Sequence, residues 1–217
     1  MDTLSATDAS FGEAFRRDLR DLFVWRRDVR RFRRDPLPEG TLERLVTLAC
    51  LAPSVGLSQP WRFVSVDDRA RRAAVRASFE ACNAAALQSQ CGERAALYAR
   101  LKLAGLDDAP CQFAVFADGA TAQGHGLGRL TMPETIHYSA VMAVHTLWLA
   151  ARAEGIGLGW VSIIDPATVA AALEVPSSWT LIGYFCMGMP VATDDVPVLE
   201  REGWETRRPP ETVLLRR

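Results

Sequence analysis

The sequence is poor in the residues that build metal centres and disulfide frameworks. Its 217 residues include only three histidines, five cysteines and one lysine, Lys102. No two cysteines form a Cys-x-x-Cys pair, and no histidines stand in the His-x-x-x-His spacing of a helical zinc site. We therefore expect neither a metal site nor a disulfide framework, and the unpaired cysteines are typical of a cytoplasmic protein.

Long apolar runs and a charge excess are also missing. No run approaches the roughly 20 apolar residues that a membrane helix needs, and residues 1–14 lack the charged and apolar regions of an export signal. The 25 Lys and Arg residues nearly balance 26 Asp and Glu residues, which gives a net charge of -1. This composition argues against a basic nucleic-acid binder and against a membrane protein.

Positive charge is nevertheless concentrated in one place, because six arginines and a single acid, Asp28, fall within residues 26–34. A positive focus on an otherwise acidic chain suggests an anionic ligand, most simply a phosphate. The alternative is a solvated helix end, where arginines interact favourably with the helix dipole. The sequence leaves both interpretations open. The arginines within this window are Arg26, Arg27, Arg30, Arg31, Arg33 and Arg34.

Hydrophobic periodicity predicts alternating helices and strands around one core. We expect one α+β domain over residues 1–217, with its core at about 11–190 and an extended tail at 190–217 that has little pattern. Helices are expected at 11–26, 39–52, 68–104 with a break near 91–92, 137–154 and 167–173, and strands at 61–66, 112–117, 160–164 and 180–187.

Two further segments combine rigid backbone with polar groups. Residues 52–63 read APSVGLSQPWRF, so two prolines and a glycine restrict a loop that carries Ser54. Such loops bind planar heterocycles, although most are merely connections between a helix and a strand. Residues 155–162 read GIGLGWVS. This glycine run follows a helix and precedes a strand, the reverse of the order in a dinucleotide-binding motif.

Together with the RRDVRRF segment at 26–32, these segments make the chain resemble the FMN-dependent nitroreductase superfamily over residues 20–190. Within it the chain most resembles the flavin-destroying branch. Three features favour that branch: Asp28, where ordinary nitroreductases usually carry serine, the Gly-Trp-Val-Ser strand that ends at Ser162, and the Gly-Trp-Glu sequence at 203–205. Leu57 departs from the pattern, because many relatives carry Asn there.

The resemblance implies a mixed β-sheet flanked by helices, and a homodimer with FMN at the subunit interface. It also implies that apolar Leu103 covers the flavin ring and that Ser54 bonds its polar edge. Without the resemblance, Leu103 would be an ordinary leucine on a helix face. The implied FMN-binding residues are Arg26, Arg27, Asp28, Val29, Arg30, Ser54, Leu103 and Ser162.

The implied reaction consumes the cofactor: reduced FMN, supplied by a flavin reductase, reacts with dioxygen and is fragmented to 5,6-dimethylbenzimidazole and erythrose 4-phosphate. Asp28 and Ser162 are the implied catalytic residues. We expect the arginines to keep Asp28 ionised, so that it accepts a proton from the ribityl chain. We expect Ser162 to be a buried hydroxyl that bonds the flavin. The alternatives are an ion pair of Asp28 with Arg27 or Arg31, and a core serine bonded to backbone.

Two other functions remain open. An NAD(P)H-dependent nitroreductase or flavin reductase would share the FMN pocket but would pass electrons to an external acceptor. A non-catalytic module would only hold FMN. The fate of bound flavin during cycles of reduction and exposure to air separates the three functions.

Overall fold

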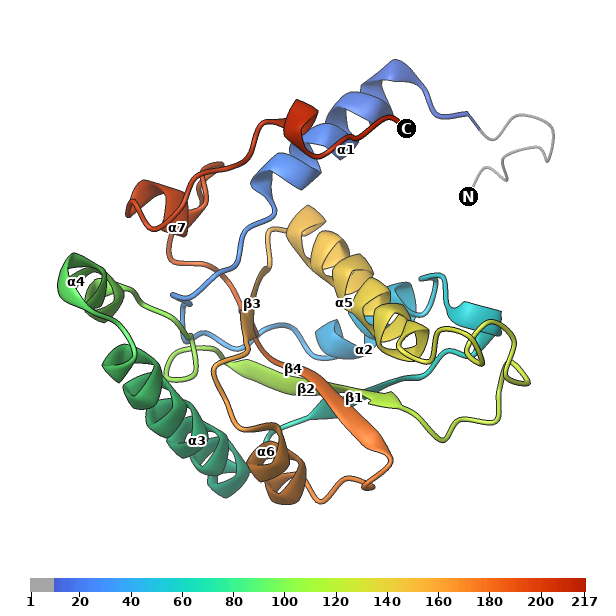
Figure 1. Ribbon diagram of the computed structural model, residues 1–217, viewed down its shortest axis with the longest axis horizontal. Helices are drawn as coiled ribbons and strands as arrows, with labels where there is room; N and C mark the ends of the chain where they lie inside the picture. Colours follow the sequence, from blue (N-terminus) through green and yellow to red (C-terminus); the bar gives the residue numbers. More distant parts are fainter. Residues whose placement is uncertain (1–9) are drawn as a thin grey trace.

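A four-stranded sheet forms the centre of the computed structural model, which describes residues 10–217 (Figure 1). The segment 1–9, part of the N-terminus considered above, lies outside the described residues. The strands are β1 (Trp61–Ser65), β2 (Cys111–Asp118), β3 (Gly157–Val161) and β4 (Trp179–Gly188), in the order β1-β2-β4-β3. All three strand pairs are antiparallel. The α+β class is confirmed, but the parallel pairing expected of a mixed sheet is limited, within residues 10–217, to an isolated bridge between Asp28 and Leu158.

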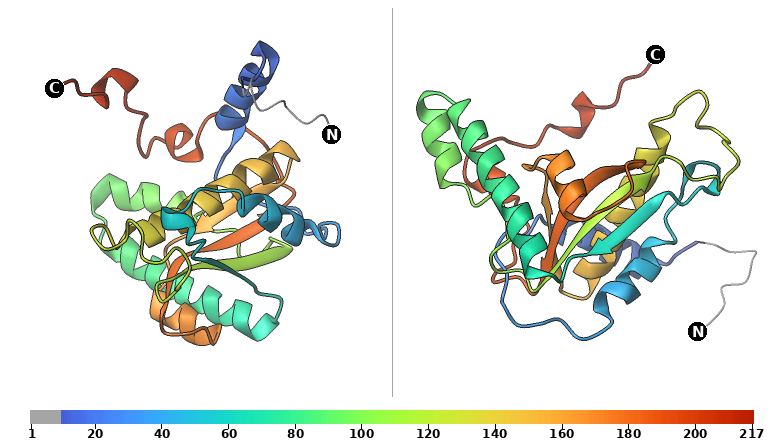
Figure 2. Two further views of the ribbon diagram at one scale, coloured as in Figure 1. Left: turned by 90° about the vertical axis from the view of Figure 1, so that its right-hand side faces the viewer. Right: turned by 90° about the horizontal axis from the view of Figure 1, so that it is seen from below.

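Helices bury both faces of the sheet (Figures 1 and 2). On one face, α2 (Thr41–Ala49) and α5 (Thr135–Ala153) pack against Phe113 and Val115 of β2. On the other face, α3 (Arg69–Gln88) and α6 (Pro166–Ala172) enclose a second core with Phe116. Because the middle of the sheet is covered on both sides, β2 and the second half of β4 are buried in runs rather than in alternation, whereas β1 at the edge is only partly buried.

The two ends of the chain lie outside this layered core. Helix α1 (Glu13–Trp25) has no buried residue, and its Phe15 and Phe23 are about half exposed. The tail carries α7 (Val198–Arg201) and a short 3-10 turn, Pro210–Thr212. The apolar stripe that predicted α1 is therefore largely uncovered within one chain.

The tail packs against α4 (Gly92–Arg100) through Trp204. The ring of Trp204 lies 6.0 Å from that of Tyr98, with Arg94 4.7 Å from the Trp204 ring centroid. The tail therefore has a defined packing partner that its sequence did not reveal.

Most predicted elements are found within a few residues of their expected ends. The break near 91–92 separates α3 from α4, but residues 101–104 are not helical. Strand β3 begins three residues earlier than predicted, because its glycines lie inside the strand rather than before it. The loop at 52–63 contains a 3-10 turn, Val55–Leu57. Across residues 10–217, no helix combines the length and the apolar character needed to cross a membrane.

Candidate functional site

A cavity of about 250 Å³ lies beside residues 26–32, which we call the arginine segment. Four parts of the chain line it: residues 25–31, residues 100–102, the C-terminal half of α5 with the following turn, and the tail at 191–202. Trp148 and Ile156 give it an apolar wall, while Arg27, Arg30 and Lys102 give it cationic groups. A cavity with one apolar wall and several cations suits a planar ligand that carries a phosphate.

The arginine segment is held against the outer edge of β3. The Val29 amide donates to the Leu158 carbonyl at 2.9 Å, and the Trp160 amide donates to Asp28 Oδ1 at 2.8 Å. A Cβ on Gly157 would lie 2.9 Å from the Val29 side chain. The glycines of β3 therefore allow the arginine segment to approach the strand closely. The structure thus brings together two of the segments identified in the sequence, residues 26–32 and residues 155–162.

Arg26 and Arg27 are both held beside Trp148. The Arg26 guanidinium lies 5.0 Å from the centroid of the Trp148 ring, and Trp148 Nε1 donates to the Arg27 carbonyl at 3.2 Å. Arg27 also donates to the carbonyls of Val24 and Asp195. Loss of surrounding water lowers the pKa of both guanidinium groups. Within the described residues, Arg27 Nε is buried without a hydrogen-bond partner.

Asp28 pairs with Arg30, not with Arg27 or Arg31. Arg30 Nε donates to Asp28 Oδ2 at 3.0 Å, and Arg30 Nη1 donates to the Lys102 carbonyl at 3.2 Å. The side chain of Asp28 is 29% exposed and that of Arg30 is 15% exposed. The pair thus sits at the cavity with little water around it.

The pKa of Asp28 is raised, although Arg30 and Arg26 favour its ionised form as the sequence led us to expect. Burial is the largest effect, and it outweighs the opposing effects of Arg30, the Trp160 amide and Arg26. The cluster stabilises the carboxylate less than its number of arginines suggests. Arg31 and Arg33 are exposed, and Arg34 pairs with Asp108 instead.

Ser162 is exposed rather than buried, because β3 ends one residue before it. Alternate residues of a strand present their backbone groups to the same edge. Leu158 and Trp160 use that edge to bind the arginine segment, and Ser162 lies just beyond the end of the strand. The prediction that Ser162 is a core hydroxyl is wrong within one chain.

Ser54 lies away from the cavity. Its Oγ accepts from the Gln59 amide at 3.1 Å, and the next residue, Val55, donates its amide to Ser139 Oγ at 3.0 Å. Ser139 precedes Trp148 by nine positions on α5, a separation of about 13 Å along a helix. The structure therefore does not bring the loop at 52–63 to the arginine segment within one chain.

Leu103 lies in the irregular segment after α4, not on a helix face. It lines a second cavity of about 170 Å³ beside Phe79 of α3, whereas its neighbour Lys102 lines both this cavity and the one beside the arginine segment. Contact of Leu103 with a cofactor remains a prediction.

Sequence reasoning missed Trp148, Lys102 and the tail residue Asp195 as parts of this site. Trp148 belonged to the apolar stripe of α5, and Lys102 stood out only as the single lysine. Asp195 contributes a main-chain carbonyl, for which no sequence signal exists. Within residues 10–217, no group of three or more His, Cys, Asp or Glu side chains is arranged to hold a metal ion.

Comparisons with known proteins agree with this geometry. The chain is 60% identical to a 5,6-dimethylbenzimidazole synthase from Rhodospirillum rubrum over 203 residues, which cover 94% of this chain and 96% of that protein. It is 31% identical to an NADH dehydrogenase from Thermus thermophilus over 208 residues, covering 91% and 95% of the two chains.

The fold matches that of an iodotyrosine deiodinase whose crystal structure contains FMN and 3-iodo-L-tyrosine. The TM-score is 0.70 at 24% identity, and the match covers 91% of this chain and 97% of that one. The sequence profile of the Nitroreductase family matches residues 23–189, a range that contains the arginine segment, the loop at 52–63 and β3. The chain belongs to the nitroreductase family.

Proposed function

We propose that this protein is a 5,6-dimethylbenzimidazole synthase, an enzyme that uses dioxygen to fragment reduced FMN. The observation that carries the proposal is the 60% identity to the Rhodospirillum rubrum synthase along nearly the whole of both chains. The products would be 5,6-dimethylbenzimidazole, the lower ligand of cobalamin, and erythrose 4-phosphate. A separate flavin reductase would supply the reduced FMN.

The hydrogen-bond donors around the cavity suit FMN. Arg27 Nε is a buried donor with no partner among the described residues, and a phosphate oxygen would satisfy it. Arg26 and Arg30 add planar, permanently charged donors, and Trp148 and Ile156 offer apolar surface to a ring. Bound reduced FMN would supply the electrons for dioxygen and would itself be the molecule that is broken down.

Asp28 is the proton acceptor that the site offers. Arg30 and the Trp160 amide fix both carboxylate oxygens. Burial raises the pKa of Asp28 and so brings it closer to the range in which a base both accepts and releases protons. A serine at this position could donate a hydrogen bond but could not hold the proton.

A second copy of the chain would complete the site. Ser54 does not line the cavity within one protomer, and a two-fold partner can supply Ser54 from its own loop. The exposed apolar side chains of α5, including Tyr138, Val141 and Met142, fit such an interface. We therefore propose a homodimer with FMN at the subunit interface, bound by residues from both chains. The residues proposed to contact FMN are Arg26, Arg27, Asp28, Val29, Arg30, Ser54, Leu103 and Ser162.

Mixing the protein with reduced FMN in air tests the proposal. A synthase consumes the flavin and produces a benzimidazole that mass spectrometry detects. A nitroreductase or flavin reductase, the activity suggested by the similarity to the Thermus thermophilus protein, returns oxidised FMN in full. A binding module also preserves the flavin, and it gives no turnover with NAD(P)H. Full recovery of FMN from the wild-type reaction would refute the proposal.

The Asp28→Asn variant isolates the proton acceptor. It keeps the size of the side chain, so FMN should still bind, while benzimidazole formation should fall about a hundredfold or more. Ser162→Ala should also reduce product more than binding, because it removes one polar contact from the reacting side of the site. If Asp28→Asn forms product at the wild-type rate, Asp28 is only a structural ion-pair residue.

A further inference from the structure

The orientation of Arg30 depends on a segment that is distant in sequence. Two of its guanidinium nitrogens have fixed partners: Nε binds Asp28, and Nη1 binds the main-chain carbonyl of Lys102. Since the Arg30 side chain is only 15% exposed, these bonds decide where it points. The position of the Lys102 carbonyl therefore helps to set the position of the Asp28 carboxylate.

The segment 101–110 that carries this carbonyl crosses directly over the arginine segment. A Cβ on Gly105 would lie 2.3 Å from the ring of Phe32, which is itself buried. At its far end, the buried amide of Gln112 donates to the Leu106 carbonyl at 2.9 Å and to the Ala109 carbonyl at 3.4 Å. The Phe32 ring and the Gln112 side chain thus hold the middle and the far part of the segment.

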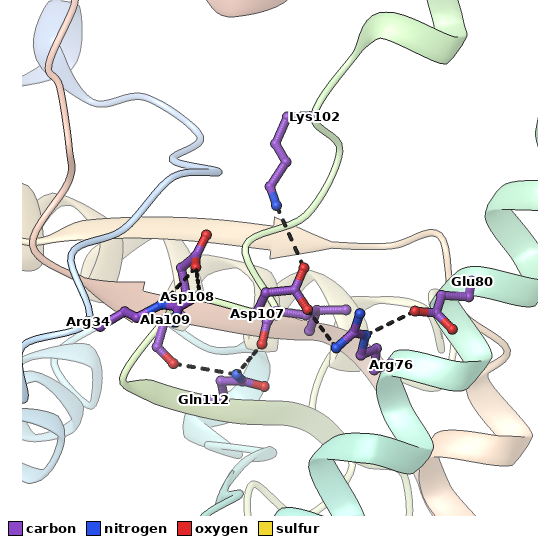
Figure 3. A network of polar contacts seen from close by, with 9 residues as sticks. Arg34, Arg76, Glu80, Lys102, Asp107, Asp108, Ala109 and Gln112 are labelled. Carbon is purple, nitrogen blue, oxygen red and sulfur yellow. Dashed lines mark hydrogen bonds and ion pairs between the residues drawn. The ribbon is translucent and has the colours of Figure 1, made fainter.

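Asp107 connects this segment to α3 and to Lys102 (Figure 3). One carboxylate oxygen lies 3.0 Å from Arg76 Nη1, and the other lies 3.8 Å from Lys102 Nζ. Arg76 is held in turn by Glu80, 2.9 Å away on the same helix. Lys102 therefore joins two sets of polar contacts: its Nζ meets Asp107 and through it α3, and its main-chain carbonyl meets Arg30 and through it Asp28.

We infer that Asp107 is a positioning residue for Asp28, acting through Lys102 and Arg30. The inference rests on the proposed function, because it assigns Asp107 to the step in which Asp28 accepts a proton. Asp107 itself lines only the cavity on the α3 side and does not reach the arginine cavity. Without its carboxylate, Lys102 and Arg76 repel each other across the turn, and the carbonyl that holds Arg30 loses its fixed place.

The neighbouring residue provides a matched control. Asp108 lies in the same turn and makes an ion pair of similar length, 2.9 Å, with Arg34. Arg34 is 78% exposed, and its side chain bonds Asp108 (Figure 3) rather than Asp28 or Arg30. Asp108→Ala therefore removes the same chemical group from the same turn and leaves the series of contacts to Asp28 intact.

The test compares Asp107→Ala, Asp107→Glu and Asp108→Ala in the full-length protein. The first readout is the share of reduced FMN that becomes benzimidazole instead of reoxidised FMN. The second is the exchange rate of the Arg30 Nε proton with water, measured by NMR before FMN is added. Asp107→Ala should lower the product share and accelerate the exchange, each about twofold to fivefold, the range expected for loss of a partly exposed ion pair. FMN affinity should change less than about twofold.

Asp107→Glu should restore both readouts, and Asp108→Ala should alter neither. The inference is overturned if Asp107→Ala leaves both readouts at wild-type values, or if Asp108→Ala has the same effect. It is also overturned if product, FMN affinity and melting temperature fall together, which marks a purely structural role. A wild-type protein that makes no benzimidazole refutes the proposed function instead, and the proton-exchange comparison still decides whether Asp107 positions Arg30.

Discussion

The Cβ that Gly159 lacks would lie 2.1 Å from the carbonyl oxygen of Val29. No rotation of a side chain relieves this contact, because the obstructing atom belongs to the main chain. Gly159 therefore sets how close the arginine segment comes to β3, and with it the hydrogen bond between Asp28 and the Trp160 amide.

Replacing Gly159 with Ala should separate the arginine segment from β3. We expect a loss of about 2 kcal/mol or more in the free energy of unfolding, typical of severe overpacking, together with weaker FMN binding. Chemical denaturation and flavin titration measure the two effects. Gly12→Ala is the control, since an added Cβ there meets no described atom within 4 Å. Normal stability and affinity in Gly159→Ala would show that the segment has another way to pack.

Arg30→Ala should weaken FMN binding by about 1.5 to 3 kcal/mol, the scale of a hydrogen bond to a charged group. The loss arises from the missing guanidinium and from the release of Asp28, its partner at 3.0 Å. Flavin fluorescence titration gives the affinity. Arg34→Ala removes a neighbouring arginine that is 78% exposed and should have little effect. Equal losses in both variants would mean that only the net charge of the cluster matters.

The raised pKa of Asp28 predicts a stability cost that depends on pH. Between the ordinary pKa of a carboxyl and the raised value, the folded state binds more protons than the unfolded state, so stability falls as pH rises through that window. Asp28→Asn cannot ionise and escapes this loss. At pH 7 the variant should therefore be more stable than wild type.

Thermal unfolding measured across the acidic range checks this prediction. The advantage of Asp28→Asn should shrink as the pH falls below the ordinary pKa of aspartate, where both proteins carry a neutral group. A variant that is less stable than wild type at pH 7, with a deficit that disappears in acid, would show that the Arg30 pair outweighs burial.

Leu57 adopts a backbone conformation that leucine disfavours, with φ of 56°. Asn is the non-glycine residue that most readily accepts this region, which gives a physical reason for the Asn that the family resemblance leads us to expect here. Leu57→Asn should therefore stabilise the fold by about 0.5 to 1 kcal/mol. Leu51→Asn replaces another exposed leucine, one without a positive φ, and should give no gain. Melting temperatures compare the two, and an equal gain in both would point to surface polarity as the cause.

The protein should be a dimer in solution, and its interface should include α5. Light scattering gives the mass directly. Val141→Glu, which places a charge on the exposed apolar side of α5, should shift the protein toward monomer and weaken FMN binding in parallel. Ala84→Glu on the exposed side of α3 is the control. A monomer that binds FMN tightly would contradict the two-chain site.

The sequence predicted the parts of this structure that depend on periodicity. Helix α5 and strands β2 and β4 appear where their apolar patterns indicate. The start of strand β3 was predicted too late, because glycine usually weakens a strand. Only the packing of Val29 reveals why glycine is required there. The amino-acid sequence alone does not reveal that contact.

The sequence predicted which residues belong to the site better than it predicted how they are arranged. The arginine segment and Asp28 do lie at a cavity. The number of nearby arginines alone does not predict the direction in which the pKa of Asp28 shifts. Arginines that point to solvent affect this pKa little, whereas burial of the carboxyl raises it. Ser54 was grouped with the arginines on family resemblance alone, and the structure separates them along α5. Lys102 enters through its carbonyl, a group that every residue has.

The position of Asp28 and Val29 on β3 also has a consequence for the solution behaviour of the protein. Strand β3 is at one end of the sheet order, and its outer edge would otherwise offer unpaired amide and carbonyl groups to another molecule. The Val29 amide and the Asp28 carboxylate occupy those groups. The residues that build the cavity therefore also protect the outer edge of β3 from edge-to-edge aggregation.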